Sequence, residues 1–352
     1  MLNPAEFIMN FKYAFRPAKP LLTIRLAKAV INTNFFGNTQ LRFVDFAIDF
    51  ACNLKCEHCF ATALEQKGRN KMSTEDYNSV AEQAMKLGCV NFSFQGGEPL
   101  MFKNLKNIIR ACYPDRNLIS VTTNGTLIDE DKIKWLKSFG VDILTVSIDS
   151  SSPEKHDRFR GMKGAYEKTL KGIKLALKNK INVTIGTVVT HQSLASGDIE
   201  GLVALAKELR VLIYLILPVP AGNWTHCKDM MLTDEDQKTV YAMTKKTHFV
   251  RTDFQANFSR FGCGAAKEIL YLTPYGDVLT CPFIHISPGN IFEDSIKIIR
   301  ERALDNPYFN HYHDKCLAST DAAFIDKHLS RTFGQKNLPL KWENVFPSDK
   351  KG

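Results

Sequence analysis

The sequence predicts an α/β fold in which a partial (β/α)6 TIM-like barrel is followed by a small α+β domain. Short β-branched and aromatic runs alternate with helical patterns through the middle of the chain, which indicates a parallel sheet. The alternation stops after Pro218, and a β-hairpin pattern follows. The 352 residues are enough for a barrel and a second module. We expect an N-terminal extension over 1–42, the barrel over 43–220, the second module over 221–330 and a C-terminal tail over 331–352.

Six strand-like runs are expected to form the barrel sheet. The first helical pattern between them opens with Ser73 and Asp76, spaced as in a capping box. Six strand–helix units make about three-quarters of a (β/α)8 barrel, whose chemistry lies at the carboxyl ends of the strands. The expected strands are 43–50, 90–94, 118–122, 143–148, 183–189 and 212–217, and the expected helices are 73–87, 104–112, 130–138, 165–178 and 199–209.

The segment after the barrel begins at a boundary marked by Pro218, Pro220, Gly222 and Asn223. A helical pattern follows over 233–247. The runs 269–273 and 277–280, joined by a Pro-Tyr-Gly turn, predict a β-hairpin. The tail from residue 331 is polar and contains proline, so we expect it to be loosely ordered.

The formal charge of +9 is spread along the chain, which favours a general solubility surface over a nucleic-acid site. The stretch 1–36 is more asymmetric, because aromatic and aliphatic residues are interleaved with its basic residues Lys12, Arg16, Lys19, Arg25 and Lys28. We expect this stretch to pack on the barrel with its charges outward. Contact with a membrane surface or a lipid-like substrate is the alternative.

The sequence contains no long uninterrupted apolar run and no signal-peptide pattern, so the expected location is the cytoplasm. Nine cysteines in uneven clusters are more typical of metal ligation than of a secreted disulfide framework.

Three of these cysteines, Cys52, Cys56 and Cys59, lie in the loop that follows the first expected strand. Closely spaced thiolates hold iron–sulfur clusters, and three of them leave the fourth iron of a cubane without a protein ligand. The competing interpretations are a zinc site completed by His58 and three merely buried thiols.

The CxxxCxxC spacing followed by Phe60 resembles the radical S-adenosylmethionine (SAM) superfamily. Further segments over about two-thirds of the chain agree with it, above all a GGEP motif at the end of the second strand. In the family this motif binds the methionine amino group of SAM. The resemblance implies a SAM-binding [4Fe–4S] cluster on Cys52, Cys56 and Cys59, and SAM contacts from Phe60, Gly96, Gly97, Glu98, Thr123, Asn124, Ser147, Asp149, Arg160 and Leu217, with Arg158 as the alternative to Arg160 for the SAM carboxylate.

A second cysteine group resembles the start of the SPASM and twitch modules, in which a cysteine, a hairpin and a G-x4-C step frame an auxiliary cluster. Here the cysteines are Cys263, Cys281 and Cys316. The dense cysteine run of a full SPASM module is absent, so the resemblance implies one auxiliary [4Fe–4S] cluster at most. Its fourth ligand is open among Cys227, His285, His311, His313 and an exogenous group.

The resemblance implies an enzyme that reductively cleaves SAM to a 5′-deoxyadenosyl radical, which takes a hydrogen atom from a small-molecule or peptide substrate. Oxidation or bond formation in natural-product, cofactor or peptide maturation is favoured, with a reductase such as flavodoxin or ferredoxin as partner. A sulfatase-type oxidation is disfavoured, because Pro282 stands where the resembled enzymes have an acidic base. A radical epimerase or a lipid-modifying enzyme is the alternative, and an iron–sulfur or zinc scaffold is the alternative outside enzymes.

Overall fold

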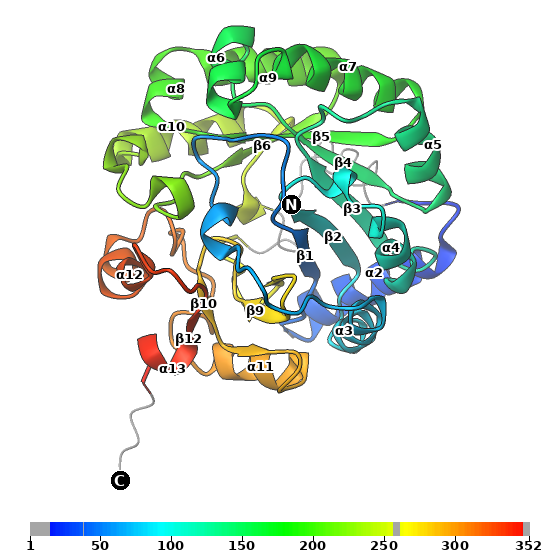
Figure 1. Ribbon diagram of the computed structural model, residues 1–352, viewed down its shortest axis with the longest axis vertical. Helices are drawn as coiled ribbons and strands as arrows, with labels where there is room; N and C mark the ends of the chain where they lie inside the picture. The colour runs from blue at the N-terminus through cyan, green and yellow to red at the C-terminus, as the bar shows by residue number, and fades with distance from the viewer. Residues whose placement is uncertain (1–14, 38, 256–260, 348–352) are drawn as a thin grey trace.

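A computed structural model describes residues 15–37, 39–255 and 261–347 of the chain. One ten-stranded sheet, in the order β11-β9-β8-β1-β2-β3-β4-β5-β6-β7, runs through the molecule and curves into a partial barrel (Figure 1). Neighbouring strands from β1 to β7 pair in parallel, as the alternating pattern predicts. The barrel strands are β1 (Phe43–Asp49), β2 (Asn91–Gly96), β3 (Leu118–Thr123), β4 (Ile143–Ser147), β5 (Asn182–Val188), β6 (Leu212–Ile216) and β7 (Val250–Arg251).

Helices lie along the outside of this sheet (Figure 1). The capping box predicted at Ser73 is present, with the Asp76 amide donating to the Ser73 hydroxyl at 3.2 Å. The helices of the barrel are α3 (Thr74–Lys86), α4 (Leu105–Ala111), α5 (Glu130–Ser138), α6 (Pro153–Arg160), α7 (Ala165–Lys178), α8 (His191–Ala195) and α9 (Asp198–Leu209), and α10 (Asp234–Lys246) follows β6.

The two faces of the barrel sheet differ in polarity because side chains alternate along each strand. Phe46 on β1 faces the helices and meets the Tyr77 ring of α3 edge-on at 5.1 Å. Asp45, one residue earlier, faces the interior together with its register partner Ser93 on β2. The interior of the barrel is therefore lined by polar groups, while the main apolar core lies between the sheet and the helices.

The predicted hairpin is present as β8 (Ile269–Leu272) and β9 (Asp277–Leu279), which pair antiparallel. β8 also pairs in parallel with β1, so the second module extends the barrel sheet. The rest of the module comprises β10 (Ile286–Ser287), β11 (Gly289–Asn290), β12 (Leu340–Lys341), α11 (Ile296–Leu304), α12 (Ala322–Lys327) and α13 (Trp342–Val345).

The expectation of a loosely ordered tail from residue 331 is wrong up to residue 347. Leu340 and Lys341 form β12 against β10. Trp342 and Val345 on α13 are buried in a second apolar core with Phe309 and Phe324. The polar composition of the tail concealed these few apolar anchors, which are enough to pack it.

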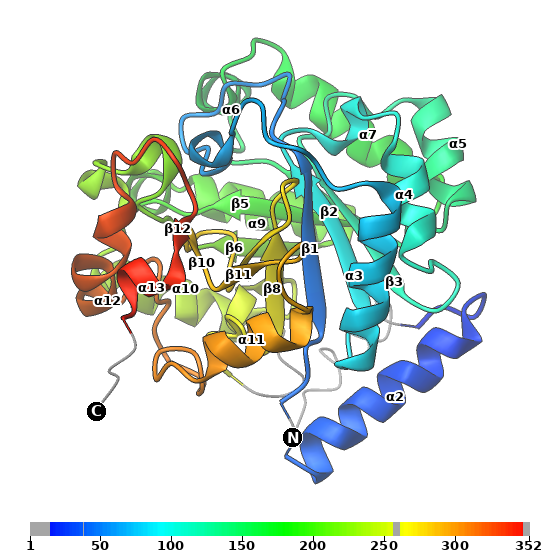
Figure 2. The same ribbon diagram turned by 60° about the horizontal axis from the view of Figure 1, so that its bottom comes forward.

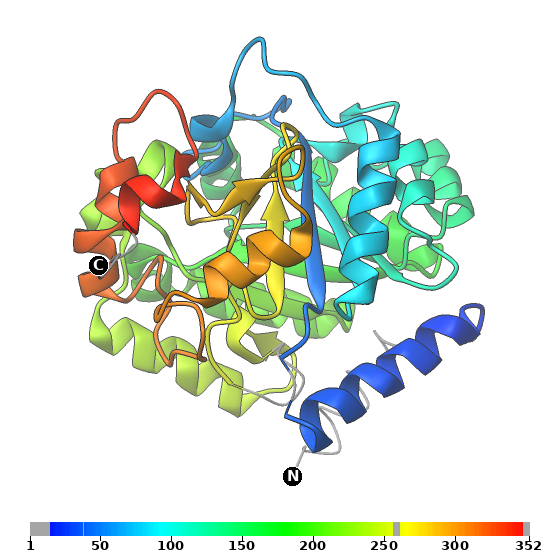
Figure 3. The ribbon, with the colours of Figure 1, turned by 90° about the horizontal axis from the view of Figure 1, so that it is seen from below.

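The N-terminal helix α2 (Pro20–Phe35) lies beside the barrel, below α3 and β3 in Figure 2 and separate from the second module in Figure 3. Lys28 is exposed as expected, but the N-cap residue Lys19 and Arg25 point inward instead. Lys19 Nζ donates to the carbonyls of Asn117 and Gly140 and pairs with Asp142, and Arg25 donates to the Arg116 carbonyl at 3.0 Å. The outward surface also carries many apolar side chains, with Leu21, Ile24, Val30, Ile31, Phe35 and Phe36 all exposed. Lys12 lies outside the described residues.

No described helix, α2 included, combines the length and the apolar character that crossing a bilayer requires.

Candidate functional site

The first cysteine group lies in the loop between β1 and the 3-10 helix η1 (Ala61–Leu64), at the carboxyl edge of the barrel. The thiols of Cys52, Cys56 and Cys59 are close enough for their charges to interact. Burial raises the pKa of Cys52 and of Cys56, so both are thiols at neutral pH until a metal displaces the protons. The three predicted ligands are therefore brought together.

The end of β2 supports this loop from one side through its backbone. The Gly97 amide donates to the Asp49 carbonyl at 2.7 Å, and the Glu98 amide donates to the Ala51 carbonyl at 3.0 Å. A Cβ on Gly97 would lie only 2.0 Å from the Ala51 oxygen, and Gly96 has a φ of +123°. The two glycines of the GGEP motif thus allow the close approach of β2 to the residues before Cys52.

A second support comes from η3 (Gly222–Trp224), which the sequence marked only as a boundary. The Asn223 amide donates to the Cys59 carbonyl at 3.1 Å, and the Asn223 Nδ2 donates to the Cys56 carbonyl at 3.0 Å. A Cβ on Gly222 would lie 2.2 Å from the Cys59 oxygen. The turn-forming residues of this segment predicted a turn, but they did not show that the turn contacts the first cysteine loop.

Glu98 is fully buried beneath the loop. Its Oε1 accepts hydrogen bonds from the Leu100 amide at 3.0 Å and the Thr123 hydroxyl at 2.7 Å, and its Oε2 accepts one from the Asn124 amide at 2.8 Å. Burial raises the pKa of Glu98, and these three donors oppose that rise. Oε2 retains acceptor capacity, since each carboxylate oxygen can accept two hydrogen bonds.

Asn124 connects the end of β3 to the cysteine loop. Its Nδ2 lies 3.9 Å from Cys52 Sγ and donates to Asn53 Oδ1 at 2.9 Å. Its Oδ1 accepts hydrogen bonds from the amide and the hydroxyl of Thr126. Asn53 and Thr126 were not singled out from the sequence, because single amide and hydroxyl side chains in loops carry no spacing signal.

Arg160, at the end of α6, faces both a carboxylate and a thiol. Its Nε donates to Asp149 Oδ2 at 2.6 Å, and its Nη1 lies 3.6 Å from Cys56 Sγ. Burial alone would raise the pKa of Asp149, but the positive charge of Arg160 holds it below its ordinary value. Arg158 lines a neighbouring cavity of about 280 Å³, to whose lining Asp149 also contributes. The remaining predicted SAM contacts, Phe60, Ser147 and Leu217, are half-buried around the same edge.

His58 does not join the three cysteines as a zinc ligand would. Its ring stacks on Phe159 at 4.7 Å with an interplanar angle of 13°, and it also contacts Trp224. Burial lowers the pKa of His58 to about 4, so the ring is neutral. Within residues 15–37, 39–255 and 261–347, no three His, Cys, Asp or Glu side chains surround a single ion position.

The second cysteine group lies where the hairpin meets the C-terminal segment. The charges of Cys263, Cys281 and Cys316 interact with one another, and that of Asp253 with Cys281 and Cys316. Burial raises the pKa of both Cys281 and Cys316. Three mutually close thiols in a buried place are a donor set that suits an iron–sulfur cluster.

The side chains considered as a fourth ligand differ in their surroundings. Cys227 lies beside Asn223, near the first cysteine loop. The rings of His311 and His313 contact each other at 3.9 Å, and His313 Nε2 bonds to the Tyr308 carbonyl. His285 is buried, and its Nε2 has no hydrogen-bond partner in the described structure.

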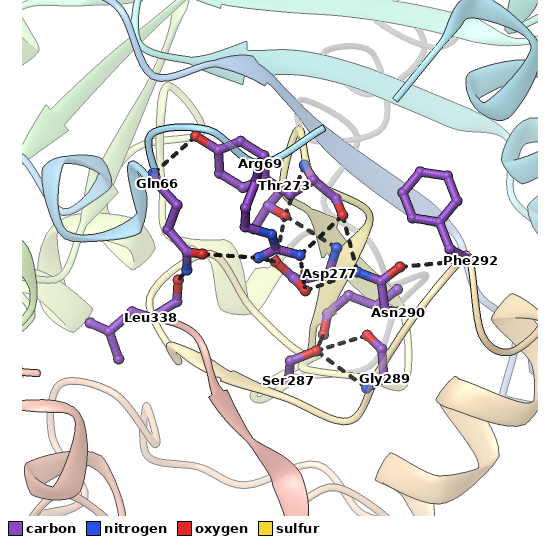
Figure 4. A network of polar contacts seen from close by, with 11 residues as sticks. Gln66, Arg69, Thr273, Asp277, Ser287, Gly289, Asn290, Phe292 and Leu338 are labelled. Carbon is purple, nitrogen blue, oxygen red and sulfur yellow. Dashed lines mark hydrogen bonds and ion pairs between the residues drawn. The ribbon is translucent and has the colours of Figure 1, made fainter. Parts of the chain in front are cut away.

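A polar network fixes the hairpin to the segment that leaves the first cysteine loop (Figure 4). Arg69 binds Asp277 through two nitrogens, at 2.7 and 3.0 Å, and its guanidinium lies over the Tyr275 ring. The Tyr275 hydroxyl accepts a hydrogen bond from the Gln66 amide at 2.9 Å, and Asn290 Nδ2 donates to Asp277 at 2.9 Å. The two cysteine groups thus belong to one connected framework.

The chain is similar to known proteins over much of its length. The family model described as the radical SAM superfamily matches residues 50–203. The AdoMet-dependent heme synthase of Methanosarcina barkeri is 27% identical over 290 residues, which cover 74% of this chain and 82% of that protein. The antilisterial bacteriocin subtilosin biosynthesis protein AlbA of Bacillus subtilis is 26% identical over 319 residues, 83% of this chain and 69% of AlbA.

The fold is shared with SuiB of Streptococcus suis, whose crystal structure was solved with its precursor peptide SuiA. The superposition has a TM-score of 0.60 at 19% identity and covers 88% of this chain and 72% of SuiB.

Proposed function

Because this chain is an enzyme of the radical SAM superfamily, with the family domain over residues 50–203, we propose that it binds a [4Fe–4S] cluster on Cys52, Cys56 and Cys59. When bound, this cluster supplies the electron that cleaves SAM and yields the 5′-deoxyadenosyl radical. We propose oxidation or bond formation in a peptide or cofactor precursor as the outcome.

The observation that carries this proposal is the arrangement of the first cysteine loop. Three thiols lie together at the carboxyl edge of the barrel, while the adjacent histidine is turned into an aromatic stack. Three thiolates leave one iron of a cubane available to another ligand. The methionine amino and carboxylate groups of SAM suit that position.

Charged and polar groups around the loop support SAM binding there. Oε2 of Glu98 is an acceptor for the SAM ammonium, and Asn124 holds the Cys52 side of the loop. Arg160 offers a guanidinium beside Cys56, suited to a carboxylate by its fork geometry. The same guanidinium pairs with Asp149.

The second cysteine group supports the oxidative or bond-forming class over epimerisation. An auxiliary cluster on Cys263, Cys281 and Cys316 would accept the electron that a substrate loses or would anchor the substrate. Pro282 is not acidic, so any proton released in such an oxidation goes to another group.

Peptide and cofactor precursors are both represented among similar proteins. AlbA takes part in subtilosin biosynthesis and SuiB binds the SuiA precursor peptide, whereas the M. barkeri relative is a heme synthase. We propose a peptide as the first substrate class to test, since the SuiB likeness covers most of this chain.

The iron content of anaerobically reconstituted protein tests the cluster assignment. We expect about eight irons per chain, the sum of two cubanes. Replacing Cys52, Cys56 and Cys59 together with alanine should remove about half of the iron and abolish 5′-deoxyadenosine formation.

The buried Cys89→Ala variant is the matched control, because Cys89 lies in the core away from both groups. Its iron content should equal that of the native chain. Full iron loading in the triple variant, or stoichiometric zinc in the native protein, would contradict the proposal.

A further inference from the structure

Two buried cationic side chains, Lys267 and Arg300, bind the backbone of the loop that follows Cys263. The Lys267 residue is 1% exposed, and its Nζ donates to the carbonyls of Ala265 and Phe309, both at 3.2 Å. Arg300 is also buried, and its guanidinium donates to carbonyls of Ala266 at 3.0 Å and Lys267 at 2.6 Å. All of these acceptors are neutral. Among the described residues, no ion pair joins Lys267 or Arg300 to a carboxylate.

The acidic groups nearby have other partners or positions. Glu268 pairs with Arg42 at 2.9 Å and accepts a hydrogen bond from the Tyr312 hydroxyl. The charge of Asp253 interacts with those of Cys281 and Cys316, and burial raises the pKa of Asp253 while Arg42 opposes the rise. Glu301, whose charge also reaches Arg300, pairs with Lys297 at 3.8 Å, so neither Lys267 nor Arg300 has an ion-paired carboxylate in the described part of the chain.

An excess of buried positive charge destabilises a protein unless an opposite charge balances it. Burial lowers the pKa of Lys267 to about 8, which reflects that cost, while the charge of Cys263 opposes the shift. Lys267 is also joined directly to the cysteine loop, because Ala265 lies two residues after Cys263. The Cys263 amide in turn donates to the His313 carbonyl at 2.8 Å, which brings the Cys316 segment alongside.

A cubane cluster held by three or more thiolates carries net negative charge, and its reduction potential depends on the charges around it. We propose that Lys267, assisted by Arg300, supplies the positive charge that balances an auxiliary cluster on Cys263, Cys281 and Cys316 and makes this cluster easier to reduce. The inference rests on the auxiliary cluster of the proposed function. Reduction adds one electron and no atom, so a nearby cation stabilises the reduced form more than the oxidised form.

The test uses the full chain with Cys52, Cys56 and Cys59 replaced by alanine, so that only the auxiliary cluster can contribute. Its midpoint potential is measured by a redox titration monitored by electron paramagnetic resonance. Lys267→Met should shift the midpoint to a more negative potential, and Lys267→Arg, which keeps the charge, should restore it.

Lys19→Met is the matched control, because Lys19 is a buried lysine that does have a carboxylate partner, Asp142. It should leave the midpoint unchanged and should lower the stability of the iron-free protein, since Asp142 loses a partner. Lys267→Met should instead leave the iron-free protein as stable as its parent or more stable, because it removes a buried charge without a carboxylate.

An iron-loaded Lys267→Met protein with an unchanged midpoint would overturn the role of Lys267 and leave the auxiliary cluster standing. If Lys267→Met is insoluble, Lys267→Gln and Arg300→Gln provide the same comparison. A native-like triple-cysteine variant that binds no iron would instead overturn the auxiliary cluster of the proposed function, and this inference with it.

Discussion

At the scale of single residues, the first cysteine loop is held by groups that contribute little or no side chain. Gly97 and Gly222 approach the loop from opposite sides, where a Cβ would collide with the carbonyls of Ala51 and Cys59. Arg160 is the charged counterpart, since it is buried against both Asp149 and Cys56. The position of the thiols therefore depends on contacts from three separate parts of the chain.

Arg160→Lys should weaken SAM binding about ten- to a hundredfold, because a point charge replaces a fork that bonds two acceptors. Equilibrium binding to the iron-loaded protein measures this. Arg160→Met should in addition destabilise the fold by about 3–5 kcal/mol, since Asp149 stays buried without its cation. Arg158→Lys is the control and should bind SAM normally. An equal loss in that control would move the carboxylate contact to Arg158.

At the scale of elements, local sequence patterns predicted many of the helices and strands. Contacts between residues that are far apart in the sequence were harder to predict. Strands β1 to β6, the hairpin and the Ser73 capping box were expected from periodicity and turn residues, which act over a few positions, whereas the short strand β7 was not. The contact of Asn223 with Cys56 spans 167 residues, and no local pattern encodes it. Lys19 and Arg25 were expected to point outward for a similar reason. Their carbonyl partners lie in loops that are distant in the sequence, so no local pattern reveals them.

The hairpin gives a prediction at this scale. Asp277→Asn removes the negative charge from the network of Figure 4 and leaves Arg69 without its bidentate partner. We expect a loss of about 1–3 kcal/mol in the free energy of unfolding, and faster loss of auxiliary iron to a chelator, because Cys281 follows β9 closely. Urea unfolding and chelator kinetics measure the two effects.

The control for the hairpin is Asp294→Asn, which breaks the more exposed pair with Arg302. Pairs of that kind contribute about 0–1 kcal/mol, so its stability and iron release should stay near those of the native chain. Equal effects in the two variants would show that the network does not position Cys281.

At the scale of the whole molecule, two sets of cysteines and two apolar cores are joined by one sheet. The main core lies between barrel and helices, and the second core is built from α12, α13 and their neighbours. The second core escaped prediction because its contributors, Phe309, Phe324 and Trp342, are isolated aromatic residues in a polar stretch. Apolar periodicity detects regular elements and misses such scattered anchors.

The pairing of β8 with β1 has a consequence for how the chain tolerates shortening. One edge of β1 pairs with β2. Its other edge pairs with β8, more than two hundred positions later in the chain, with Phe43 aligned to Ile269. A chain that ends at residue 255 would leave the backbone donors and acceptors of β1 open, on a strand flanked by apolar side chains. Open strands of this kind recruit other chains. We expect the shortened protein to form concentration-dependent aggregates, measurable by light scattering, whereas removal of residues 348–352 should leave the native chain monodisperse. A shortened chain that stays monodisperse would show that the barrel closes its own edge.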